Sequence, residues 1–181
     1  MGKPGLSWHS GDMTASPVPA VDLALPDAAA TAALAARMAP HLGAGDTLLL
    51  SGALGAGKTH FARALIHALQ TTAGQVTEDV PSPSFTLVQT YRAGALEVWH
   101  TDLFRLHDAD ELIELGLDAA FETALCLIEW PDRLGPHAPP DALHLSLTVA
   151  PAGPDPAQEP ARIATLTGGT PRHAPLFAAL S

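Results

Sequence analysis

A glycine-rich segment between an apolar run and an amphipathic pattern is the strongest constraint on how this chain folds. Residues 52–59 read GALGAGKT, which matches the pattern G-x-x-x-x-G-K-[ST]. The continuous apolar run at residues 47–51 precedes it and is typical of a strand covered on both faces. Phe61, Leu65 and Leu69 then recur every four residues, as on one face of a helix. This order of strand, loop and helix predicts a phosphate-binding loop (P-loop).

The residue types of this loop suit a nucleotide. Glycines allow backbone N–H groups to surround a phosphate, and the start of the following helix adds a partial positive charge. We expect Lys58 to reach the β- and γ-phosphates and the Thr59 hydroxyl to bind Mg²⁺. The alternative, a glycine-rich turn that only caps a helix, is disfavoured by the strand and helix on either side.

Two acidic residues at predicted strand ends are candidates for completing the site, since Mg²⁺ at a P-loop needs carboxylate help. Glu129 follows the apolar residues 124–128, which predicts a place at the carboxyl edge of a central strand, where open α/β sheets bind ligands. Asp102 ends a more polar strand that carries His100 on the same face. We assign Glu129 to the metal, and Asp102 to orienting the waters of the metal or the attacking water. The alternative for each is a solvated carboxylate.

Apolar patterning along the chain predicts an α/β fold: a single P-loop NTPase domain with a mixed parallel and antiparallel central sheet flanked by helices. Strands are expected at residues 21–25, 47–51, 86–91, 97–102, 124–128, 143–149 and 163–166. Helices are expected from Asp27 to about Met38, after the P-loop, and from Asp108 to Gly116. Residues 92–95 are expected to form a hairpin turn. Residues 1–20 are predicted to be a flexible tail, residues 21–181 the domain, and residues 151–160 a proline-rich loop.

Composition limits the partners and the compartment. The chain has 9 Lys and Arg against 19 Asp and Glu, a net charge of −10, and no basic run. Direct tight binding to nucleic acid is therefore disfavoured, and any role with nucleic acid should pass through a partner. No apolar run has the length of a membrane span or signal peptide, which predicts a cytoplasmic protein that does not associate with a membrane. The single cysteine, Cys126, excludes a disulfide scaffold and is expected to be a buried, inert thiol.

Several sequence blocks, taken in order, resemble the TsaE family (also called YjeE), the ATPases of bacterial threonylcarbamoyladenosine synthesis. The blocks are Leu25-Pro26-Asp27 with Thr31, GALGAGKT, VPSPSFTLVQTY (80–91), WHTDLFRL (99–106), ELIELGL (111–117) and CLIEWPDRL (126–134). The resemblance covers about residues 21–170. Many NTPases share the P-loop, but the SPxF, HxDLxR and IEWP blocks together are specific to the family.

The resemblance implies an ATPase that converts ATP to ADP and phosphate with Mg²⁺ and works with the TsaD and TsaB proteins. Together they place a threonylcarbamoyl group on the adenosine next to the anticodon in tRNAs that read codons starting with A. The tRNA is then contacted only through the complex.

Position by position, the resemblance also implies the site residues. The catalytic residues are Lys58, Asp102 and Glu129, and the metal ligands are Thr59 and Glu129. The nucleotide-binding residues are Thr31, Gly55, Ala56, Gly57, Lys58, Thr59, His60 and Ser84. Thr31 corresponds to the threonine on the adenine side and Ser84 to the switch-like block, whereas the position of His60 also suits an ordinary surface histidine.

The chain departs from the family pattern at two residues and in one stretch. Ser84 replaces the usual threonine and keeps a hydroxyl, whereas Phe104 replaces the usual tyrosine and is given no polar role. The proline-rich residues 151–160 look like an insertion, so the correspondence beyond them, Arg162 included, is not fixed.

Two other functions fit parts of the sequence. One is a small-molecule P-loop kinase. Such kinases usually add an arginine-bearing lid, and no arginine cluster follows the P-loop beyond Arg63, which disfavours a kinase. A nucleotide-dependent assembly factor that does not require turnover has the same sequence features as the ATPase, so the sequence does not separate these two.

Overall fold

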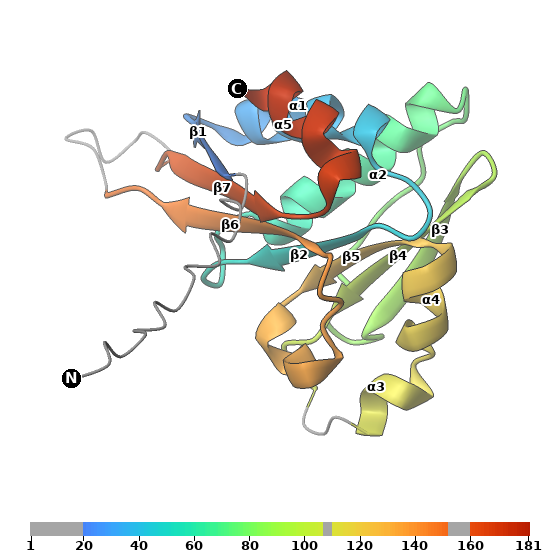
Figure 1. Ribbon diagram of the computed structural model, residues 1–181. Coiled ribbons are helices and arrows are strands. Elements are labelled where there is room, and N and C mark those ends of the chain that lie inside the picture. Colours follow the sequence, from blue (N-terminus) through green and yellow to red (C-terminus); the bar gives the residue numbers. More distant parts are fainter. Residues whose placement is uncertain (1–19, 107–109, 152–159) are drawn as a thin grey trace, which may run out of the picture.

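A seven-stranded sheet runs through the molecule in the order β1-β7-β6-β2-β5-β4-β3 (Figure 1). The computed structural model describes residues 20–106, 110–151 and 160–181. The expectations for the tail at residues 1–19 and for most of the proline-rich loop, residues 152–159, lie outside the described residues.

The strands are β1 (Ala20–Leu25), β2 (Thr47–Ser51), β3 (Val88–Ala93), β4 (Leu96–Asp102), β5 (Leu125–Glu129), β6 (Leu143–Val149) and β7 (Arg162–Gly168). The α-helices are α1 (Ala28–Met38), α2 (Lys58–Thr72), α3 (Asp110–Glu114), α4 (Leu117–Thr123) and α5 (Ala174–Leu180). Short 3₁₀ helices are η1 (Ala39–His41), η2 (Pro131–His137) and η3 (Pro171–His173).

The centre of the sheet is parallel and its margins are antiparallel. β2 pairs in parallel with β5 and β6, and β4 pairs in parallel with β5. β1, β7 and β3 add antiparallel pairs at the two sides. The mixed sheet predicted from the sequence is therefore confirmed. β2 and β5 read as apolar runs because helices cover both faces of these central strands.

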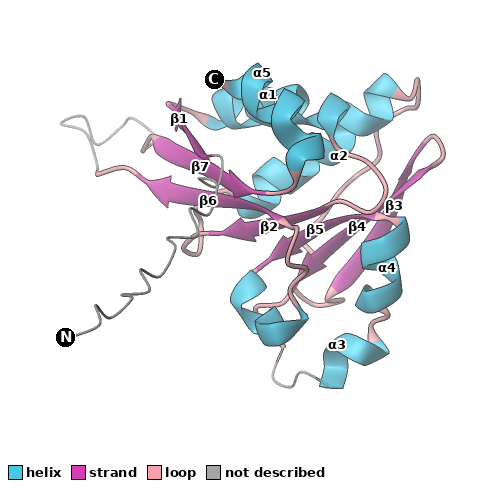
Figure 2. Cartoon of the chain, viewed as in Figure 1, coloured by secondary structure: helices cyan, strands magenta, loops and turns pink. Residues whose placement is uncertain are grey.

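Helices lie on both faces of the sheet: α1, α2 and α5 on one face, and α3, α4 and η2 (orange in Figure 1) on the other (Figures 1 and 2). α1 begins where the sequence predicts, because the Asp27 carboxylate accepts a hydrogen bond from the Ala30 N–H at 2.7 Å. Within the described residues, no helix is long and apolar enough to cross a membrane.

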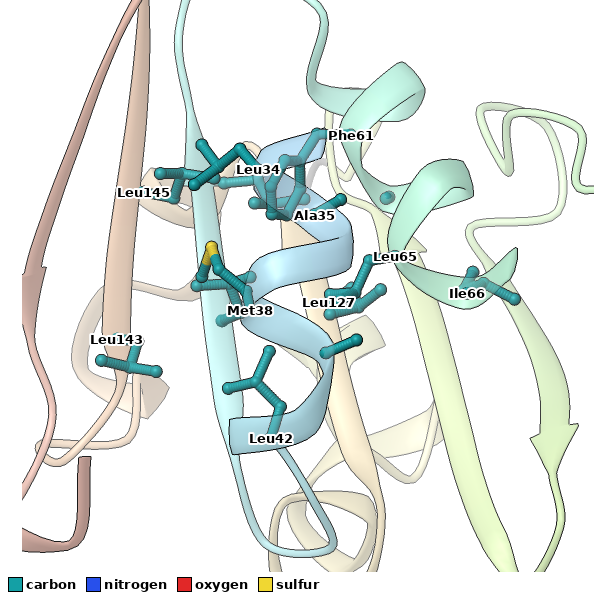
Figure 3. Close-up of a cluster of buried hydrophobic side chains, with 14 of the residues drawn as sticks. Leu34, Ala35, Met38, Leu42, Phe61, Leu65, Ile66, Leu127, Leu143 and Leu145 are labelled. Atoms are coloured by element: carbon teal, nitrogen blue, oxygen red, sulfur yellow. The ribbon is translucent and has the colours of Figure 1, made fainter. Parts of the chain in front are cut away.

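The hydrophobic core between α1, α2 and the sheet holds the P-loop helix in place. Figure 3 shows α1 and α2 side chains meeting leucines of the central strands. The labelled residues are Leu34, Ala35, Met38, Leu42, Phe61, Leu65, Ile66, Leu127, Leu143 and Leu145. Truncating one such leucine to alanine typically costs about 2–5 kcal/mol. This packing fixes α2 relative to β2 and β5, and so fixes the loop between β2 and α2.

The buried cysteine behaves as the sequence predicts. Cys126 lies inside β5, is fully buried and forms no disulfide. Burial raises the pKa of Cys126 to about 12, so its thiol stays protonated and unreactive.

The hairpin of β3 and β4 differs from the sequence-based prediction at both ends. Arg92 and Ala93 pair with Glu97 and Leu96, so the turn is Gly94-Ala95 and not residues 92–95. Gly94 has a φ of +63°, which allows a turn of two residues. β3 begins at Val88 and not at residue 86, because the preceding residues form turns.

The sequence analysis did not predict α4 or α5, and it ended β7 too early. Asp108, the expected start of a helix, lies outside the described residues, and α3 begins at Asp110. Asp46, buried at the start of β2, anchors the segment that leads into α5: it accepts a hydrogen bond from the His173 Nε2–H at 2.7 Å and pairs with Arg172. The Thr170 N–H donates to His173 Nδ1, so the ring proton is on Nε2.

We predict that Gly52→Ala lowers the free energy of unfolding by about 2 kcal/mol, measured by urea denaturation. Gly52 has a φ of +139°, and an added Cβ would press against the Leu147 carbonyl oxygen of β6. Gly43→Ala is the control, since an added Cβ there meets no atom within 4 Å. Equal midpoints for the two variants would contradict this account of the loop.

Candidate nucleotide-binding site

The P-loop joins the end of β2 to the start of α2. Gly57 precedes the first helical residue with a φ of +106°, a left-handed conformation that favours glycine. The α2 helix is 15 residues long, so its aligned peptide dipoles place a partial positive charge at the loop. The strand, the loop and the helix thus follow one another as predicted, and the helix start has the backbone geometry that suits an anion.

Both candidate acids lie at the carboxyl ends of neighbouring parallel strands. Asp102 of β4 is opposite Glu129 of β5, and Glu129 is opposite Leu50 of β2. Because β2 leads directly into the P-loop, the strand register brings the two carboxylates to that loop. Both residues are almost fully buried, which excludes the alternative of freely solvated carboxylates.

Thr59 and Glu129 offer two oxygen ligands side by side. The Thr59 hydroxyl donates to Glu129 Oε2 at 3.0 Å, and the other carboxylate oxygen, Oε1, lies 2.9 Å from His100 Nε2. Mg²⁺ prefers oxygen ligands and commonly takes one or two carboxylates with phosphates and waters. Among the described residues no group of three or more His, Cys, Asp or Glu suits a metal. The donor set fits a Mg²⁺ ion that a nucleotide and waters share.

Lys58 faces the same space from the first turn of α2. Its ammonium group donates to the carbonyl oxygens of Gly52 and Ala53, at 2.8 and 3.0 Å. The centroid of the Trp130 ring lies 4.0 Å from the Nζ atom, in cation–π geometry. Burial lowers the pKa of Lys58, whereas Glu129 and Asp102 act to raise it. The two carboxylates thus favour the charged form of the lysine.

Asp102 ties the Ser82–Ser84 stretch to β4. The Ser84 hydroxyl donates to Asp102 Oδ2 at 2.7 Å, and the Phe104 N–H donates to Oδ1 at 3.0 Å. The Ser82 and Ser84 hydroxyls are 2.7 Å apart. Ser84, present where the family pattern has threonine, thus uses the hydroxyl that both residues share.

These side chains line one pocket of about 240 Å³. Its lining residues are Leu54, Gly55, Gly57, Lys58, Thr59, His60, Ser82, Ser84, Asp102, Glu129 and Trp130. A second pocket, of about 280 Å³, shares Gly55, Gly57 and His60 with the first and adds Ala28, Thr31 and Arg162. The two pockets therefore adjoin at the loop.

The fold gathers all but one of the predicted side chains in these pockets. Thr31 lines only the second pocket, where its hydroxyl donates to the Asp27 carbonyl oxygen at 3.3 Å. His60 borders both pockets, and its Nε2–H donates to the Ala28 carbonyl oxygen at 3.0 Å. Ala56 is the exception, because its methyl group is buried in the core, which leaves only its backbone for a ligand.

Among the residues at the site that were not assigned from the sequence are Trp130, Arg162 and His100. Trp130 lies with its ring under the Lys58 ammonium group and packs against the Phe104 ring, with the ring centroids 4.9 Å apart and the ring planes tilted by 45°. Its φ of +58° is unusual for a bulky residue and turns the chain sharply after Glu129. Arg162 begins β7 and lines the second pocket, because β7 pairs with both β1 and β6. The insertion before it kept the sequence analysis from assigning this position. His100 was recognised only as lying on the same face as Asp102.

We predict that Lys58→Ala abolishes tight ATP binding while the protein stays folded, because it removes the cation that lines the first pocket. Calorimetric titration together with circular dichroism tests this. Arg92→Ala, which removes an exposed cation on β3, should bind ATP as the wild type does. Wild-type affinity in a folded Lys58→Ala protein would exclude the P-loop assignment.

We predict that substitutions of Glu129 and Asp102 have different effects on binding and on hydrolysis. Glu129→Gln is expected to weaken Mg²⁺-dependent nucleotide binding by more than about tenfold, since it removes charge beside the Thr59 hydroxyl. Asp102→Asn should leave binding within about twofold and slow hydrolysis by about 10²-fold. Titrations and single-turnover rates measure both, and equal binding defects in the two variants would argue against this division of roles.

Comparison with known proteins places the chain. The sequence profile described as "Threonylcarbamoyl adenosine biosynthesis protein TsaE" matches residues 25–153. A Rickettsia felis protein named tRNA threonylcarbamoyladenosine biosynthesis protein TsaE is 38% identical over 119 residues, covering 66% of this chain and 67% of the relative. The Bacillus subtilis protein of the same name is 36% identical over 121 residues, covering 66% and 72%. A crystal structure of Bacillus subtilis YdiB is 27% identical, with a TM-score of 0.72, and covers 92% of this chain and 97% of that one.

Proposed function

This chain belongs to the TsaE family, and on that basis we propose that it is an ATPase of tRNA threonylcarbamoyladenosine biosynthesis. It binds and hydrolyses ATP with Mg²⁺ and acts with TsaD and TsaB. Together they form the threonylcarbamoyl group on the adenosine next to the anticodon in tRNAs that read codons starting with A.

The contact between Thr59 and Glu129 is the observation that carries the ATPase proposal. A 3.0 Å hydrogen bond joins the start of the P-loop helix to the end of a central strand, 70 residues apart in the chain. A hydroxyl next to the P-loop lysine and a carboxylate at a strand end form the Mg²⁺ site of P-loop NTPases. Lys58 and Asp102 line the same pocket.

Each residue then has one task in hydrolysis. Loop N–H groups and Lys58 would hold the phosphates, and Thr59 and Glu129 would hold Mg²⁺, whose charge would stabilise the phosphoryl oxygens. Asp102, 4% exposed at the pocket, orients the attacking water. The Ser84 hydroxyl donates a hydrogen bond to Asp102, and so links the carboxylate that orients the water to the Ser82–Ser84 stretch.

The mouth of the site suits a protein partner. Leu54, in the P-loop, and Phe85, next to Ser84, are each at least 80% exposed, and Phe104 is about half exposed. Exposed apolar side chains around a pocket are typical of a docking surface. In the described part of the chain no arginine lines the first pocket, so a partner that completes or orders the site would accelerate hydrolysis. The acidic net charge of −10 supports contact with tRNA through that partner.

We predict that the isolated protein hydrolyses ATP slowly and that adding a TsaB–TsaD pair raises the rate by about 10³-fold or more. Phe85→Ala should reduce this stimulation. Val76→Ala should not, because Val76 is at least as exposed as Phe85 but follows the C-terminal end of α2, whereas the P-loop is at the N-terminal end of this helix. Phosphate release measured against added partner tests the proposal, and a fast rate that the pair leaves unchanged would overturn it.

The same partners distinguish an ATPase from an assembly factor that needs only bound nucleotide. With a non-hydrolysable ATP analogue, the ATPase proposal expects tRNA modification to stop after at most one turnover per complex. Undiminished modification with the analogue would favour the assembly factor.

A further inference from the structure

We propose that His100 is a positioning residue that holds the Glu129 carboxylate in the orientation needed for Mg²⁺. This inference rests on the proposed function, since it concerns the metal that accompanies the nucleotide. It adds a residue that does not line the pocket and does not touch the ligand.

The two oxygens of Glu129 have different partners. Oε1 lies 2.9 Å from His100 Nε2, and Oε2 accepts the Thr59 hydroxyl at 3.0 Å. The side chain of His100 is fully buried on β4, and that of Glu129 is 3% exposed. The histidine thus holds one oxygen from inside the protein and leaves the other turned toward the P-loop helix.

Strand register produces this arrangement. His100 is opposite Leu127, two residues before Glu129, so the histidine reaches Glu129 diagonally across the β4–β5 pair. Side chains two residues apart on a strand share a face, which places His100 and Asp102 on the face that carries Glu129. The contact therefore depends on the rigid sheet and not on a loop.

The hydrogen bond to Glu129 is the only polar contact that the described residues offer the His100 ring. An ionised carboxylate can only accept, so Nε2 carries the proton and donates it. The other nitrogen, Nδ1, is buried without a hydrogen-bond partner among the described residues. Burying an imidazole with one nitrogen unpaired costs free energy that an apolar side chain would avoid. Packing alone therefore does not account for a histidine here, whereas orienting a carboxylate does.

Fixing the carboxylate should strengthen metal binding. A glutamate has three rotatable side-chain bonds, and a ligand that is already oriented loses less entropy when the ion binds. Removing a group that orients a metal ligand typically costs 10–100-fold in metal affinity or activity. We expect a loss of this size for His100 variants that cannot donate to Oε1.

Three substitutions at this position separate donor geometry from packing. His100→Gln keeps an N–H donor the same number of bonds from the backbone as Nε2, and should retain most of the Mg²⁺ affinity. His100→Asn places its donor one bond closer to the backbone, at the Nδ1 level, and should lose 10–100-fold. His100→Leu removes the donor and should lose as much.

The measurement is calorimetric titration of the full chain with ADP, in Mg²⁺ and in EDTA. Affinity without Mg²⁺ should stay within about twofold of wild type in every variant, because a positioning residue for the metal acts only when the metal binds. A merely structural defect would weaken both titrations together. Mn²⁺ binding to the ADP complex, followed by electron paramagnetic resonance, provides a direct reading of metal affinity.

Thr101→Val is the matched control. Thr101 is the next residue of the same strand, is fully buried, faces the opposite side of the sheet, and has a hydroxyl without a partner among the described residues. The Thr101→Val substitution should leave Mg²⁺ affinity unchanged.

Wild-type Mg²⁺ affinity in His100→Asn or His100→Leu would overturn the positioning role, and if the leucine variant does not fold, the asparagine and glutamine variants still decide. If Mg²⁺ did not change the ADP affinity of the wild-type protein, the proposed function would be overturned instead, and this inference with it.

Discussion

The parallel pairing of β2 with β5 is the constraint on which the rest of the site depends. β2 delivers the P-loop and α2, and β5 delivers Glu129, so this one register sets the 3.0 Å contact between Thr59 and Glu129. β4 then adds Asp102 beside Glu129, and behind them His100. A slip of one residue would send each of these side chains to the other face of the sheet. The cores on both faces bury all of β5 and all of β2 except Ser51, and therefore specify the chemistry as well as the fold.

Such a site places charge in a largely buried setting, and its contacts offset the cost. Lys58 lies against two backbone carbonyls and the Trp130 ring, and Asp102 accepts hydrogen bonds through both oxygens. A buried ion without such partners would be strongly unfavourable. These contacts also couple the pocket to its surroundings, because Ser84 connects Asp102 to the exposed Phe85 at the mouth. A partner that contacts Phe85 would act on a carboxylate that the proposal assigns to catalysis.

Local signals predicted the parts of the site that local sequence determines. The P-loop, the cap at Asp27 and the buried strand before Glu129 are each encoded within a few residues, and the structure has all three. The contacts of His100, Trp130 and Arg162 depend on strand order and on a sharp turn, which no short pattern contains. The hairpin shows the same limit at a smaller scale: Gly94 marked the turn, but only cross-strand pairing fixed its length at two residues. The segment before α5 is held by the contact of His173 with Asp46, 127 residues away in the chain, which periodicity does not reveal.

The central claim is that one pocket, between the P-loop and the ends of β4 and β5, binds the nucleotide and its metal. A crystal structure of the chain with a non-hydrolysable ATP analogue and Mn²⁺, the ion located by anomalous scattering, tests this most directly. The account predicts the triphosphate on the loop beside Lys58, with the ion bound by the Thr59 hydroxyl and the Glu129 carboxylate. A triphosphate bound elsewhere, or an ion that neither residue contacts, would contradict it.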